Sequence, residues 1–205
     1  MFDFISIIEH LGAFSFALSG IRLASHKNID WFGAYVIGLI TAIGGGTTRD
    51  ILLNETPFWM LQPSYLIITG VSIVAALLFS GRLVKLKKTL FLFDAIGLGL
   101  FVVAGLEKSL DAGFPFWVAI IMGMITGTVG GVIRDVLINE IPLLFRRDVY
   151  ALTCIAGGLV YFVCFKLGLN SAITGTLAAI SIMIFRILAV RYHIQMPTLK
   201  KQDTF

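Results

Sequence analysis

Two short stretches of the chain combine glycines with an adjacent arginine and aspartate. They read Gly44-Gly45-Gly46-Thr47-Thr48-Arg49-Asp50 and Gly130-Gly131-Val132-Ile133-Arg134-Asp135. Carbonyl and hydroxyl oxygens replace part of a cation's hydration shell, and carboxylates raise the local cation concentration. This chemistry suits a small monovalent cation. The candidate pore or substrate lining is Gly44, Gly45, Gly46, Thr47, Thr48, Arg49, Asp50, Thr128, Gly130, Gly131, Arg134 and Asp135.

The composition indicates the elements that must position these residues. Of 205 residues, 58% are hydrophobic and 14% are charged, and the mean hydropathy is +0.93. About a quarter of the residues of a soluble domain are charged, so this is an integral membrane protein. About 20 apolar residues span a bilayer as a helix. We expect one all-α transmembrane domain, residues 1–205, with spans near 4–24, 31–48, 64–81, 89–107, 115–133, 149–166 and 171–190.

The basic residues predict the orientation in the membrane. With seven spans, three Lys and Arg residues lie on the side of the amino terminus and twelve lie on the other side. The positive-inside rule then places the amino terminus outside and the carboxyl terminus in the cytoplasm, in the cell inner (plasma) membrane. Residues 82–88, which hold four basic residues, would face anionic lipid headgroups. This placement explains the net charge of +4 without nucleic-acid binding.

The chain contains an internal repeat. A shift of 85 residues places Arg49 and Asp50 on Arg134 and Asp135. Repeat one covers about 3–80, repeat two about 88–165, and a seventh helix follows at about 171–190. Three spans per repeat is an odd number, so the second copy enters the membrane from the opposite side, and a pseudo-twofold axis in the membrane plane relates the copies. Inverted repeats of this kind often build a permeation or substrate site between interrupted helices.

The glycines predict breaks in the second and fifth helices. Each glycine in a helix costs about 1 kcal/mol relative to alanine. The run from Thr47 to Asp50 has the spacing of a capping box, so a new short helix can begin there. Neighbouring Arg and Asp side chains do not face one another well on a helix, so each should pair elsewhere, Arg49 with a carboxylate of the other repeat. The alternative interpretation is that the glycines serve only close helix packing.

Four other acidic residues are candidate vestibule charges. Glu55 and Glu140 each belong to an Asn-Glu-x-Pro sequence, and Glu9 and Asp94 lie at equivalent membrane ends. A solvated loop face is the alternative for the first two. No catalytic constellation, metal-ligand spacing or Walker-type loop is present in the sequence, so we expect neither an enzyme nor a cofactor or bound metal beyond a permeant potassium ion.

The paired glycine-Arg-Asp motifs and the inverted duplication resemble the prokaryotic members of the trimeric intracellular cation (TRIC) channel family, also described as glycine transporter domain proteins. The resemblance covers about 4–190. It implies a homotrimer with one potassium-conducting pore in each subunit, flanked by Gly44 to Gly46 and by Gly130 and Gly131. Two hypotheses remain, a passive monovalent cation channel and a secondary transporter or facilitator of a small amino acid such as glycine.

Overall fold

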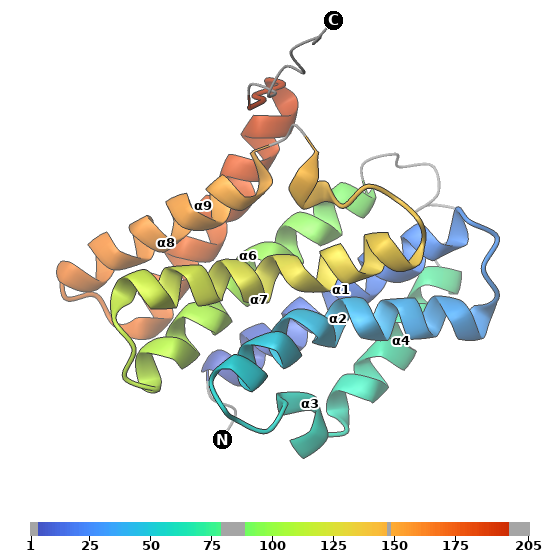
Figure 1. Ribbon diagram of the computed structural model, residues 1–205, viewed down its shortest axis with the longest axis horizontal. Coiled ribbons are helices and arrows are strands. Elements are labelled where there is room, and N and C mark those ends of the chain that lie inside the picture. Colours follow the sequence, from blue (N-terminus) through green and yellow to red (C-terminus); the bar gives the residue numbers. More distant parts are fainter. Residues whose placement is uncertain (1–3, 79–88, 147–148, 197–205) are drawn as a thin grey trace, which may run out of the picture.

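The described part of the chain is built from helices. The computed structural model describes residues 4–78, 89–146 and 149–196 (Figure 1). Its helical segments are α1 (Phe4–Ser25), α2 (Trp31–Leu52), α3 (Phe58–Leu61), α4 (Ser64–Leu78), α6 (Thr89–Asp111), α7 (Phe116–Leu137), the 3-10 turn η1 (Leu143–Phe145), α8 (Tyr150–Lys166) and α9 (Ser171–Arg191). The seven long helices of the described residues occupy the predicted spans, so the predicted all-α membrane fold is confirmed.

The long helices differ in length. Helices α1, α2, α6, α7 and α9 are long and apolar enough to cross a membrane, with 21 to 23 residues each. Helices α4 and α8 are also apolar but have 15 and 17 residues. The predicted third span continues to residue 81, and residues 79–81 and the basic run at 82–88 lie outside the described residues.

Four helices form the centre of the molecule. Helix α1 packs on α6, α2 packs on α7, and each pair is joined through the contacts of α1 with α2 and of α6 with α7. Figure 1 shows α2 and α7 lying side by side across one face. Helix α4 covers α1 and α2, while α8 lies against α7 and α9. The seventh long helix, α9, packs mainly on α6 and α8 of the second repeat.

The predicted helix breaks are not observed. Helix α2 continues through its glycines to Leu52, and α7 continues through its glycines to Leu137. The glycines instead allow the two helices to touch. A Cβ atom on Gly45 would overlap the carbonyl oxygen of Thr126, and one on Gly130 would overlap the carbonyl oxygen of Thr41. These two contacts are reciprocal, as a twofold axis between the repeats requires, and the packing interpretation is therefore correct for both residues.

The Asn-Glu-x-Pro sequences end the two central helices. Asn54 and Asn139 have left-handed backbones, with φ of 59° and 57°. The amides of Glu55 and Glu140 then bond back to the carbonyl oxygens five residues earlier, at 2.8 Å in both repeats. This is the Schellman pattern, which satisfies the last carbonyl groups of a helix, and asparagine tolerates the left-handed conformation better than most residues. The motif therefore has a structural role in reversing the chain.

Candidate functional site

The first half of the site is the Arg49 cluster, buried where the start of α1 meets the end of α2. Arg49 donates from Nε to Oδ1 of Asp50 at 2.7 Å and from Nη1 to Oε1 of Glu9 at 2.9 Å. The hydroxyl of Tyr65 on α4 donates to the other Glu9 oxygen at 3.2 Å, and the backbone amide of Phe58 donates to Asp50 Oδ2 at 2.8 Å. Arg49 and Asp50 are completely buried, so the expectation that they avoid lipid is confirmed.

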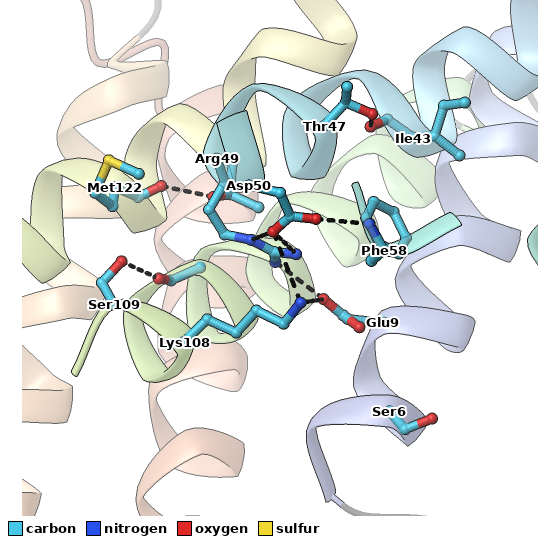
Figure 2. A network of polar contacts seen from close by, with 12 residues as sticks. Ser6, Glu9, Ile43, Thr47, Arg49, Asp50, Phe58, Lys108, Ser109 and Met122 are labelled. Carbon is cyan, nitrogen blue, oxygen red and sulfur yellow. Dashed lines mark hydrogen bonds and ion pairs between the residues drawn. The ribbon is translucent and has the colours of Figure 1, made fainter. Parts of the chain in front are cut away.

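A second cation joins the Arg49 cluster from the other repeat. Lys108 reaches in from the end of α6, and its Nζ lies 3.8 Å from Glu9 Oε1 and 3.7 Å from Asp50 Oδ1 (Figure 2). Its side chain is 24% exposed, whereas that of Arg49 is 0% exposed. The ring of Phe58 lies under both cations, 5.5 Å from Arg49 Cζ and 5.9 Å from Lys108 Nζ. Two carboxylates thus face two cations.

The second half of the site, the Arg134 cluster, repeats this geometry at the other end of the helix crossing. Arg134 donates from Nε to Oδ1 of Asp135 at 2.8 Å and from Nη1 to Oδ1 of Asp94 at 2.9 Å. Asp135 Oδ2 accepts from the backbone amide of Leu143 at 3.0 Å, as its equivalent does in the first repeat. Nη1 also donates to the hydroxyl of Ser19 on α1, at 2.8 Å. Both clusters are therefore built alike, from the end of one helix and the beginning of another.

A second buried arginine, on the seventh long helix, lies near the Arg134 cluster without an ion pair to it among the described residues. The Arg186 guanidinium is buried and stacks on the ring of Tyr150, 4.4 Å from its centroid, and on that of Phe91 at 5.2 Å. Its Nε and Nη1 have no hydrogen-bond partner within the described ranges, and neither does Oδ2 of Asp94. Arginine is weakly hydrated and stacks well on aromatic rings, so it can stay buried in this position.

Two expectations about pairing are corrected by this geometry. Both arginines contact the aspartate next to them, because the arginine side chain is long enough for its Nε to curl back to the neighbouring carboxylate. The interhelical partner of Arg49 is Glu9, which belongs to the same repeat and not to the other one. The hypothesis of structural pairing is nevertheless confirmed, since all four residues of the two motifs are buried in ion pairs.

One cavity gives access to the Arg49 cluster. It has a volume of about 420 Å³, and its wall includes Glu9, Glu55, Phe58, Lys108 and Asp111. We call it the Glu9 cavity. Three carboxylates and one ammonium line it, so its field favours cations over anions. Glu9 and Glu55 therefore lie where a vestibule charge would lie.

The equivalent acidic residues of the second repeat are placed differently. Glu140 pairs with Lys27 at 2.6 Å and with Arg146 at 3.5 Å on the exposed surface. The hydrogen bond from Lys27 lowers the pKa of Glu140 below its usual range. Asp94 is completely buried against Arg134. Glu140 is thus a paired charge on a solvated loop face and not a vestibule charge.

The candidate threonines bond to their own helices. The hydroxyl groups of Thr47, Thr48 and Thr128 donate to the carbonyl oxygens four residues earlier, at 2.7, 2.9 and 2.8 Å. Thr47 also accepts from the indole nitrogen of Trp59 at 3.1 Å. Each hydroxyl oxygen keeps acceptor capacity, which a passing cation could use.

Sequence reasoning missed several residues of the two clusters. Tyr65 and Tyr150 were recognisable because the 85-residue shift superposes them. Lys108 gave no such signal, since the shift pairs it with Leu23. Arg186 belongs to the unduplicated helix and has no counterpart at all. Residues that break the internal symmetry can be found only once the helices are packed.

The family model described as Glycine transporter matches the chain twice, at residues 6–81 and 91–166. A UPF0126 membrane protein of Vibrio cholerae is 40% identical over 194 residues, which are 94% of this chain and 81% of that protein. The UPF0126 inner membrane protein YadS of Escherichia coli K12 is 36% identical over 196 residues, 93% of this chain and 94% of that protein. The two matches of the family model have the same offset as the two charge clusters.

Solved structures share the whole fold. A TRIC cation channel is 33% identical with a TM-score of 0.85, covering 97% of this chain and 98% of that chain. The TRIC trimeric intracellular cation channel orthologue from Rhodobacter sphaeroides is 29% identical with a TM-score of 0.86, covering 93% and 98%. The chain is a membrane protein of the UPF0126, or Glycine transporter, family and belongs with the prokaryotic TRIC channels.

Proposed function

We propose that the protein is a passive monovalent cation channel, mainly for potassium, with a separate ion path in each subunit. The observation that carries the proposal is the Glu9 cavity, in which Glu9, Glu55 and Asp111 outnumber Lys108. An acidic cavity leading to buried charges concentrates cations and repels anions. The likeness to cation channels over nearly the full chain supports the same class of function.

The proposed path runs from the Glu9 cavity past Arg49 and along the α2–α7 crossing to the Arg134 cluster. In the Arg49 cluster two carboxylates face two cations. In the Arg134 cluster two carboxylates pair with Arg134, and Arg186 lies nearby over the Tyr150 ring. Between the clusters, the glycine faces of α2 and α7 are in contact at Gly45 and Gly130. On the proposed path, an ion would pass between α2 and α7 only if these two helices shifted relative to each other.

We further propose that three copies assemble, as in the trimeric relative from Rhodobacter sphaeroides, with the amino terminus and the Glu9 cavity outside and the carboxyl terminus in the cytoplasm. The predicted distribution of basic residues supports this orientation. Chemical cross-linking of the purified protein, followed by its mass in detergent, tests the trimer, and a reporter fused to either terminus tests the orientation.

The second candidate function is the facilitated transport of glycine, which the description of the matching family favours. The fold does not support the binding mode that we expected for glycine transport. A half-helix beginning after Gly46 would hold the glycine carboxylate on free amides, but α2 runs without interruption from Trp31 to Leu52. A carrier would have to bind glycine through side chains instead.

Single-channel recording of the purified protein in planar bilayers separates the two functions. In asymmetric potassium chloride, unitary currents that reverse near the potassium equilibrium potential establish the channel. A silent bilayer, together with saturable glycine uptake into liposomes containing the same protein, contradicts the channel and supports the carrier. Liposomes without protein are the control for leak.

A further inference from the structure

We propose that the protein binds one water molecule in its interior, between the side chains of Asp94, Tyr150 and Arg186. These residues belong to α6, α8 and α9, and their exposed fractions are 0%, 2% and 1%. The site is inferred from the contacts of the three side chains and does not depend on the proposed function. It is a site for a small neutral molecule that the second repeat has and the first repeat lacks.

Four buried polar atoms of these residues have no hydrogen-bond partner among the described residues. They are Oδ2 of Asp94, the hydroxyl oxygen of Tyr150, and Nε and Nη1 of Arg186. A buried polar group without a partner costs about 1–3 kcal/mol, so such groups are rare in folded proteins. The Arg186 guanidinium lies 4.4 Å from the centroid of the Tyr150 ring, which brings the groups to one place. A molecule that bridges them would satisfy them together.

The first repeat shows why the second repeat needs a bridge. The 85-residue shift places Glu9 on Asp94 and Tyr65 on Tyr150. Each carboxylate accepts from the arginine of its own cluster at 2.9 Å. The other oxygen of Glu9 accepts from the Tyr65 hydroxyl at 3.2 Å, whereas the other oxygen of Asp94 accepts from no described residue. Aspartate is one methylene group shorter than glutamate, so its carboxylate does not reach the tyrosine.

The length of this gap matches one water molecule. A methylene group adds about 1.5 Å to a side chain, so the 3.2 Å contact of Tyr65 with Glu9 would lengthen to about 4.7 Å without it. Two hydrogen bonds of about 2.8 Å that meet at one water oxygen span about 4.6 Å. A single water molecule therefore replaces the missing methylene group as the link between carboxylate and hydroxyl.

The packing beside the Tyr150 hydroxyl is looser than the packing at the equivalent place in the first repeat. There, the Phe58 ring covers Gly46, and a Cβ atom on this glycine would overlap the ring. A Cβ atom on the equivalent Gly131 would have the Tyr150 hydroxyl among its nearest atoms, at 3.7 Å. Leu143 stands at the position equivalent to Phe58, and it does not come within 4 Å of that Cβ position. The second repeat thus leaves more room around its tyrosine.

The charges around the site favour a neutral molecule over an ion. An anion would lie against the Asp94 carboxylate, and a cation would lie against the Arg186 guanidinium, in a buried place where repulsion between like charges is strong. Water can donate to Asp94 Oδ2 and accept from both Arg186 and the Tyr150 hydroxyl. These three hydrogen bonds are the number that a buried water molecule typically makes.

The water molecule joins the unduplicated helix α9 to the Arg134 cluster. Asp94 already accepts from Arg134 on α7 through its Oδ1 atom. A chain of polar contacts then runs from Arg134 through Asp94 and the water molecule to Arg186. It explains how Arg186 is buried at this place without an ion pair to a described residue, because a buried charge needs hydrogen-bond partners.

The first test is X-ray radiolytic labelling of the full-length protein in detergent and isotopically labelled water. Radiolysis of a bound water molecule produces a hydroxyl radical that modifies the side chain beside it, and mass spectrometry gives the labelling rate of each residue. Asp94→Glu restores the longer carboxylate of the first repeat and should displace the water molecule. We expect it to lower the labelling rate of Tyr150 at least about threefold. Phe101, which is equally buried but packs on Phe16, is the internal control and should keep its rate.

The second test identifies the bound molecule in crystals of the full-length protein. We expect electron density within hydrogen-bond distance of Asp94 Oδ2 and the Tyr150 hydroxyl in the wild type, and none in Asp94→Glu. Crystals grown with bromide in place of chloride and with rubidium in place of potassium distinguish water from an ion by anomalous scattering. An anomalous peak of either ion at this place would overturn the proposal.

Each remaining outcome also decides the question. Equal labelling of Tyr150 in wild type and Asp94→Glu would contradict a bound water molecule. If Asp94→Glu does not fold, the wild-type crystal decides: a direct bond from Tyr150 or Arg186 to Asp94, with no density between them, overturns the site. Neither test measures conduction, so a failure here leaves the channel proposal as it stands, and a silent bilayer leaves the water site as it stands.

Discussion

The contact between α2 and α7 predicts opposite effects for alanine at two glycines of the paired motifs. At Gly45, a methyl group would overlap the carbonyl oxygen of Thr126 on the facing helix. At Gly131, the nearest atoms to an added methyl group are side-chain atoms of Arg134 and Tyr150 at 3.7 Å, an ordinary contact distance. Gly45→Ala should therefore destabilise the fold, and Gly131→Ala should not.

The expected magnitude has two contributions. Alanine in a helix is more favourable than glycine by about 1 kcal/mol, and this gain is common to both variants. Overpacking a close contact costs about 1–3 kcal/mol, and only Gly45→Ala incurs this cost because a backbone carbonyl cannot rotate away. The difference between the two variants should thus be about 1–3 kcal/mol. At roughly 2–4 °C per kcal/mol for a chain of this size, it is resolved as a Tm difference.

The assay is thermal unfolding of purified protein in one detergent, with wild type, Gly45→Ala and Gly131→Ala compared side by side. Gly130→Ala, which would overlap the Thr41 carbonyl across the same crossing, should behave like Gly45→Ala. The double variant should lose less than the sum of the two single losses, because one displacement of the helices relieves both overlaps. Equal Tm values for Gly45→Ala and Gly131→Ala would refute the close crossing.

Two further predictions concern the ends of the central helices. Arg49→Ala leaves Glu9 and Asp50 buried without their main partner and should cost about 3–5 kcal/mol of stability. Arg146→Ala breaks an exposed ion pair and an exposed hydrogen bond to Ile141, and should cost less than about 1 kcal/mol. Similar folded yields and Tm values for both variants would contradict the buried network. Asn54→Ala should cost about 1–2 kcal/mol because its φ is 59°, while Asn54→Gly should be nearly neutral by the same Tm measurement; equal losses would show that the left-handed backbone is not the cause.

Much of the fold could be predicted from the sequence because the membrane imposes a simple rule on it. A helix must be apolar over about 20 residues to cross a bilayer, and the seven apolar stretches became the seven long helices. The internal repeat could also be predicted, since polar and glycine residues such as Arg49 and Arg134 recur at one fixed shift of 85 residues. The pairing of each arginine with a carboxylate could also be anticipated, because a lone charge in hydrocarbon is expensive.

The glycines could not be interpreted from the sequence alone. A run such as Gly44 to Gly46 has a low helix propensity and also permits the close approach of a second helix, and these two effects predict opposite structures. Which of the two structures forms depends on the residue of the second helix that packs against the glycine. Here the Thr126 carbonyl lies against Gly45, so the packing that the glycine permits outweighs its poor propensity and α2 remains continuous.

The two repeats share one pattern of an arginine and two carboxylates, but a different additional cation lies near each. This difference makes the two ends of the pseudo-twofold arrangement unequal. In the Arg49 cluster the fourth charge is Lys108, which borders a cavity, and beside the Arg134 cluster the additional cation is Arg186, which is buried and stacked on Tyr150. A twofold-symmetric path would present the same obstacle from both sides. Because Lys108 borders the Glu9 cavity and Arg186 is buried, the charges at the two ends of the crossing differ in their access to the solution. The single-channel current should therefore differ in size between positive and negative voltages of equal magnitude. Lys108→Gln should change that difference, whereas Lys166→Gln, at the end of α8, should not.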